Sequence, residues 1–228
     1  MDTSPRARPE RESLTARVRR SPTTATLVGV CVVASVAMEL DPDDRIFEAF
    51  AKVGERVRAG ELWRLFTASF LHAGILHLWI NGASLASIGP PIERVYGRLR
   101  FLAIFLLGGA AGMAASVVLV PLPSLGASAG VFALLGALLA YALRSRARLP
   151  PRVRRLLIVQ SLVIAALNLA FGFAVRFIDN AAHVGGLAGG LVLGLVLRPR
   201  RNLFDPPAAP PAPAAVPPPS PGGSPAGP

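Results

Sequence analysis

The sequence contains little cysteine and little charge. Cys31 is the only cysteine in 228 residues, so the chain cannot form an intramolecular disulfide or a cysteine-based metal site. Its place within an apolar stretch is most simply explained by packing. Charged residues make up only 16% of the chain, and several long apolar runs contain almost none. No repeat with a period of about 20 to 50 residues is visible.

These uncharged runs indicate a membrane protein. Hydrophobic residues make up 52% of the chain, and the mean hydropathy is +0.51. A transmembrane helix needs about 20 apolar residues, and a soluble core does not need several such runs in series. The first run follows three arginines, but no small-x-small cleavage site precedes the acidic stretch 41–44, so we expect a retained helix rather than a signal peptide. We predict an all-α polytopic bundle with six transmembrane helices at 23–40, 70–89, 100–120, 127–143, 154–174 and 180–197.

The distribution of positive charge predicts the orientation of the bundle. A net charge of +11 could suggest nucleic acid, but 18 of the 24 lysines and arginines fall in alternate segments between the apolar runs. Under the positive-inside rule, this asymmetry gives six spans and places both termini in the cytoplasm. We expect an integral protein of the cell (inner) membrane whose partner is the lipid bilayer and not a nucleic acid.

Two segments outside the bundle lack apolar periodicity. Residues 1–22 are polar and Arg-rich, and half of the 22 prolines lie after residue 204. We therefore predict a disordered cytoplasmic N-terminus at 1–22, a membrane domain at 23–198 and a disordered Pro/Ala-rich cytoplasmic tail at 199–228.

The long connection 41–66 is mixed in charge and amphipathic, which suits a structured insertion at the membrane interface. Trp63 and Arg64 lie near its end. Because Trp and Arg favour the headgroup region, an anchoring role is the simplest interpretation from their position alone.

Polar side chains within the predicted helices are functional candidates, because placing them in a membrane is costly. His77 and Asn81 are four residues apart on the second helix, so they share one face and can point donors into one cavity. They could equally serve as polar contacts between helices. His72 falls on another face or precedes the helix, which favours a packing or interfacial role.

Ser128 lies in the sequence Gly126-Ala127-Ser128-Ala129-Gly130, at the predicted start of the fourth helix. A serine at such a position is usually a helix cap. The Gly-x-Ser-x-Gly spacing also occurs in the nucleophile elbow of soluble hydrolases, but that motif follows a strand, and Pro121 and Pro123 oppose one here. The motif alone is weak evidence.

His183 lies in the first turn of the last predicted helix, near a face of small residues. Gly186, Gly190 and Gly194 recur every fourth residue and allow another backbone to approach closely. The fourth helix offers a matching stripe, which consists of Ala129, Ala133, Gly136 and Ala140. We predict that these stripes pack together and bring the His183 imidazole to the Ser128 hydroxyl.

A serine becomes an effective nucleophile when a histidine within hydrogen-bond reach takes its proton. Attack on a peptide carbonyl then creates an oxyanion, which requires fixed donors. The backbone N–H of Ser128 and the side chains of His77 and Asn81 could supply them. This chemistry requires no metal or organic cofactor.

In the order and spacing of these residues, the sequence resembles the rhomboid family over roughly residues 25–197. The matching positions are Trp63-Arg64, His72, His77, Asn81, Glu93, Gly97, Gly126-x-Ser128 and His183 with the glycines that follow it. The resemblance implies a six-helix intramembrane serine protease that cleaves transmembrane segments of membrane proteins.

The resemblance also implies roles for individual residues. Ser128 and His183 would form a catalytic dyad, His77 and Asn81 would help to bind the oxyanion, and Phe132 would pack against His183. Ala129 departs from the family pattern, in which glycine often follows the serine, and alanine adopts a positive φ less readily. Asp179, four residues before His183, could be a triad acid, but a capping or interfacial role is favoured because the family works with a dyad.

Two other functions fit parts of the sequence. A catalytically silent relative would bind membrane helices on the same scaffold, although the retention of Ser128 and His183 opposes this. A small-solute transporter would also place polar residues in broken apolar helices, but it predicts inverted repeats, which are not seen.

Overall fold

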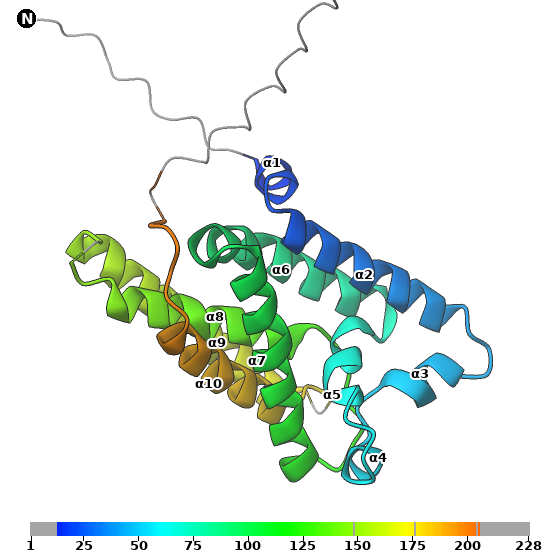
Figure 1. The fold of residues 1–228 in the computed structure, drawn as a ribbon. Coiled ribbons are helices and arrows are strands. Elements are labelled where there is room, and N and C mark those ends of the chain that lie inside the picture. The colour runs from blue at the N-terminus through cyan, green and yellow to red at the C-terminus, as the bar shows by residue number, and fades with distance from the viewer. Residues whose placement is uncertain (1–12, 148, 176, 204, 206–228) are drawn as a thin grey trace, which may run out of the picture.

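The computed structural model describes residues 13–147, 149–175, 177–203 and 205, and these fold into helices without a strand. Figure 1 shows their arrangement. The elements are α1 (Leu14–Arg19), α2 (Pro22–Glu39), α3 (Arg45–Phe50), α4 (Gly54–Arg58), α5 (Arg64–Thr67), the 3-10 helix η1 (Ala68–Phe70), α6 (Gly74–Tyr96), α7 (Arg98–Leu119), α8 (Ser128–Arg144), α9 (Pro151–Ala174) and α10 (Asn180–Val196).

The predicted all-α membrane bundle is confirmed. Among the described helices, α2, α7 and α9 are long and apolar enough to cross a membrane. The helices α8 and α10 are also apolar, with 17 residues each, and α6 has 23 residues. That the bundle crosses the membrane six times stays a prediction.

The helix α10 packs closely against both α8 and α7. On the α8 side, a Cβ added at Gly186 would overlap the backbone of Ala129, and one at Gly190 would overlap that of Ala133. This confirms the predicted contact between the two small-residue stripes. On the other side, Gly185 and Gly189 pack against α7, a second glycine face that we did not predict.

The helix α6 continues further than we predicted. We expected it to end at residue 89, but it runs through Pro90 and Pro91 to Tyr96. Its last turns are tied to α2, because the Glu93 carboxylate accepts hydrogen bonds from the backbone N–H groups of Thr23 and Thr24 at 3.0 and 2.8 Å. Packing against neighbouring helices lets a membrane helix tolerate proline.

The structure also corrects the predicted disordered ends where it describes them. Residues 14–19 form α1, whose N-terminus is capped by the Ser13 hydroxyl. After α10, the backbone N–H of Arg200 donates to Val95 O at 2.8 Å, and that of Leu203 donates to the Tyr141 hydroxyl at 3.0 Å. The predictions for residues 1–12 and 206–228 lie outside the described residues.

The connection after α2 forms a structured insertion, made of α3, α4 and α5. Arg64 is 2% exposed and is not a headgroup anchor. Its guanidinium donates to Ala51 O at 2.8 Å, to Glu48 O at 2.7 Å and to Glu61 Oε2 at 2.6 Å. Arg64 therefore holds the insertion together from within, whereas Trp63 is half exposed.

Candidate active site

Ser128 is the first residue of α8, and Ala127 is its N-cap. Its hydroxyl is therefore not the helix cap that a serine near a helix start usually provides. Instead, Ser128 places its backbone N–H among the first N–H groups of the helix, which have no partner within the helix and can bind a negative charge.

The loop that leads to Ser128 is anchored by hydrogen bonds to the segment between α5 and α6. The Gly126 N–H donates to Ala68 O at 2.9 Å, and the Ala127 N–H donates to His72 Nε2 at 3.1 Å. Because Nε2 accepts this bond, the neutral His72 ring carries its proton on Nδ1. Nδ1 in turn lies 3.1 Å from the Ser35 hydroxyl of α2. His72 is thus a packed residue, as expected, and also holds the backbone next to the candidate nucleophile.

His77 faces this loop from α6. Gly126 has a φ of +123°, and a Cβ added there would lie 2.9 Å from His77 Nε2 and 3.9 Å from Ser128 Oγ. The imidazole and the hydroxyl therefore border the same small space. Gly126 leaves this space open, because any side chain at this position would be strained and would press on His77.

Asn81 lies one turn further along α6 and is buried. Its Nδ2 donates to His77 O at 3.1 Å, which fixes the amide on the same helical face as His77. An amide nitrogen carries two protons, so one donor is available beyond this bond.

His183 lies in the first turn of α10 and is 7% exposed. Its ring stacks on Phe132 with centroids 4.3 Å apart and an interplanar angle of 7°, which is the contact that the resemblance implies. Phe132 is one turn after Ser128, and Gly186, one turn after His183, touches the Ala129 backbone. These two contacts bring the His183 imidazole alongside the first turn of α8. Among the described residues, His183 Nδ1 has no hydrogen-bond partner.

Asp179 is the N-cap of α10 and not a partner of the imidazole. Its Oδ1 accepts the Ala182 N–H at 2.9 Å, and its Oδ2 accepts hydrogen bonds from the hydroxyls of Ser116 and Ser124. The favoured capping role is confirmed, and no carboxylate among the described residues hydrogen-bonds the His183 imidazole.

The sequence did not single out Ser116, Ser124 or Lys52. Ser124 belongs to the loop before Ser128, and its backbone pairs with that of Lys52 through hydrogen bonds of 3.0 and 2.9 Å. Lys52 is fully buried, and its Nζ donates to Leu122 O at 2.7 Å. Burial lowers the Lys52 pKa, and the charge of Asp179 partly opposes this. A lysine within a mixed-charge connection gives no sign in the sequence that it is buried.

The part of the chain that the structure describes contains no group of three or more His, Cys, Asp or Glu residues that could hold a metal ion. The site instead combines a hydroxyl, an imidazole on a neighbouring helix and several N–H donors. Such a set can carry out acyl transfer.

Known proteins resemble this chain. A family profile described as "Rhomboid domain" matches residues 59–200. Rhomboid protease GluP of Bacillus subtilis (strain 168) is 46% identical over 147 residues, which cover 64% of this chain and 28% of that protein. RHOMBOID-like protein 5 of Arabidopsis thaliana is 36% identical over 160 residues, covering 68% of this chain and 51% of that protein. Inactive RHOMBOID-like protein 8 of the same plant is 35% identical over 127 residues, covering 55% and 35%. This chain thus spans about half of these relatives or less.

Proposed function

Because the chain belongs to the rhomboid family of integral membrane proteins, we propose that it is an intramembrane serine endopeptidase that cleaves transmembrane segments of other membrane proteins. Ser128 is the nucleophile and His183 the general base. The observation that carries this proposal is the contact between α8 and α10. Phe132, one turn after Ser128 on α8, stacks on the ring of His183 on α10.

The reaction proceeds in two steps. In the first, His183 takes the proton of Ser128 Oγ as the oxygen attacks the peptide carbonyl, and then gives this proton to the departing amine. In the second, His183 activates a water molecule that attacks the acyl-enzyme, and Ser128 recovers its proton. Stacking on Phe132 fixes the plane of the imidazole through both steps, which a dyad without an orienting acid requires.

The negative charge of each tetrahedral intermediate falls near the Ser128 N–H, His77 Nε2 and the free amide proton of Asn81. His77 must present a proton at Nε2 to act as such a donor. The 2.9 Å between His77 Nε2 and the Cβ position of Gly126 supports this role, because it places the ring at the nucleophile's loop. Gly186 and Gly190 support the dyad indirectly, since they let α10 approach α8.

The test compares wild type with Ser128→Ala and His183→Ala, at equal expression, in cleavage of a tagged single-span substrate in membranes. We expect each substitution to lower cleavage by about 1,000-fold or more, because the nucleophile and its base act as a unit. A fluorophosphonate probe should label wild type and fail to label Ser128→Ala. Ser161→Ala, which removes a buried hydroxyl of α9, serves as a control and should cleave normally.

A silent, helix-binding role is the second candidate, since one relative at 35% identity is named inactive. It predicts that wild type and both variants bind a single-span protein equally, with neither cleavage nor probe labelling on a panel of substrates. Equal behaviour of all three chains would favour this role over proteolysis.

A further inference from the structure

The segments that carry the two proposed catalytic residues are also joined by residues just before each of them. Ser124 lies four residues before Ser128, and Asp179 lies four residues before His183. The Ser124 hydroxyl donates to Asp179 Oδ2 at 2.5 Å. The loop that carries the nucleophile is therefore bonded directly to the start of the helix that carries the base.

Two neighbours complete this connection. The Ser116 hydroxyl at the end of α7 also donates to Asp179 Oδ2 and lies 3.4 Å from the Ser124 hydroxyl. Lys52 pairs with the Ser124 backbone, and its buried Nζ holds Leu122 O of the same loop at 2.7 Å. The Asp179 carboxylate thus joins the start of α10 to α7 and to the loop before α8, and Lys52 links this loop to the insertion.

We propose that Ser124 and Asp179 form a clasp that positions the Ser128–His183 dyad, with both residues acting as positioning residues rather than catalytic ones. This inference rests on the proposed protease function. Hydrogen bonds to a carboxylate are stronger than those between neutral groups, so the clasp can resist displacement of α10 along α8. The clasp is needed because glycine faces allow close approach but do not fix how far one helix slides past the other.

The Asp179 carboxylate has two separable duties. Oδ1 caps α10 through the Ala182 N–H, whereas Oδ2 accepts the two serine hydroxyls. Asp179→Asn retains a capping oxygen but replaces the second acceptor with an amide donor. Ser124→Ala removes the clasp and leaves the cap intact. Ser124→Thr retains the hydroxyl and should rescue function.

The experiment measures kcat and KM on a single-span substrate in proteoliposomes, per active site titrated with a fluorophosphonate probe. We expect Ser124→Ala and Asp179→Asn each to lower kcat by about 10- to 100-fold, because small misplacements of reacting groups cost this much. KM should stay within about 2-fold of wild type. The kcat of the double variant should be no lower than that of the less active single variant, because either change already breaks the clasp. Ser124→Thr should stay within about 3-fold of wild type, and Ser161→Ala, a buried serine outside the clasp, should match wild type.

Hydrogen exchange supplies a readout that does not depend on activity. Ser124→Ala should raise exchange in the first turns of α10, although the substitution lies in another segment. A loss of stability alone would lower the titratable fraction and leave kcat per site unchanged. Normal kcat and unchanged exchange in Ser124→Ala would overturn the clasp and leave the protease assignment standing. A wild type that neither cleaves nor labels would overturn both.

Discussion

At the scale of single residues, Gly126 is constrained both by its backbone conformation and by the side chains beside it. Its φ of +123° is strained for any other residue, and the space beside it is bordered by His77 Nε2 and Ser128 Oγ. We expect Gly126→Ala to lower kcat by about 10- to 100-fold, because the added methyl displaces the His77 imidazole from its proposed place beside the oxyanion.

Gly60 provides a matched control for this substitution. It also has a positive φ, of +107°, but a Cβ there would meet nothing within 4 Å. Gly60→Ala should therefore cost about 1–3 kcal/mol of stability from backbone strain and leave kcat unchanged. Thermal unfolding and cleavage rates of both variants separate the two effects. Equal kcat values for Gly126→Ala and wild type would contradict the proposed place of His77.

Some of the proposed site could be predicted from the sequence because its spacing is local, and the small-residue stripes of α8 and α10 indicated which helices bring Ser128 and His183 together. His77 and Asn81 share a helical face by their spacing, whereas the place of Phe132 beside His183 was implied by the family resemblance. The clasp could not be found in this way. No sequence pattern relates Ser124 to Asp179, and the pairing of Ser124 with Lys52 depends on how the insertion folds over the loop.

At the scale of elements, apolar runs located the membrane helices, but they did not predict helix ends that depend on neighbours. The extension of α6 past two prolines depends on Glu93 reaching α2, and the fold of α3 to α5 depends on the buried Arg64. The contact between α10 and α8 was predictable because small residues at every fourth position line one helical face and let another backbone approach closely.

This contact leads to a prediction about stability. A Cβ at Gly190 would overlap the carbonyl group and Cα of Ala133. We expect Gly190→Ala to destabilise the fold by about 1–3 kcal/mol, since the packed helices must separate to admit it. Gly29→Ala, on α2 where nothing lies within 4 Å, should be neutral or stabilising by up to about 1 kcal/mol. Thermal unfolding in detergent checks both, and a Gly190→Ala variant as stable as Gly29→Ala would contradict the packing.

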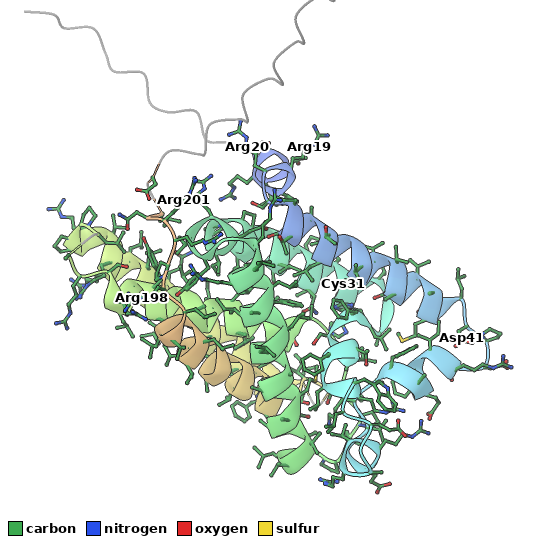
Figure 2. The ribbon with its side chains drawn as sticks, viewed as in Figure 1. Arg19, Arg20, Cys31, Asp41, Arg198 and Arg201 are labelled. Carbon is green, nitrogen blue, oxygen red and sulfur yellow. The ribbon has the colours of Figure 1, made fainter. Side chains whose placement is uncertain are left out.

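At the scale of the whole molecule, the proposed active site and the arginines near the two ends of the chain lie at opposite ends. Figure 2 shows Arg19, Arg20 and Arg201 at one end and Asp41 at the other. The insertion that follows Asp41 pairs with the loop before Ser128 through Lys52. The proposed site therefore lies toward the end away from these arginines, and the positive-inside rule predicts that this end is outside the cytoplasm.

This orientation can be tested with two matched cysteine substitutions. In a Cys31→Ala background, Ala59→Cys would lie exposed beyond α4, and Ala147→Cys would lie exposed in the turn between α8 and α9. We expect a membrane-impermeant maleimide to label Ala59→Cys in intact cells and to reach Ala147→Cys only after the membrane is opened. Several arginines surround Ala147, and the positive-inside rule keeps such a segment in the cytoplasm. Ala59 and Ala147 lie toward opposite ends of α8, so they should lie on opposite sides of the membrane. The reverse labelling pattern would contradict this orientation. It would mean that the proposed dyad faces the cytoplasm and that water reaches it from that side.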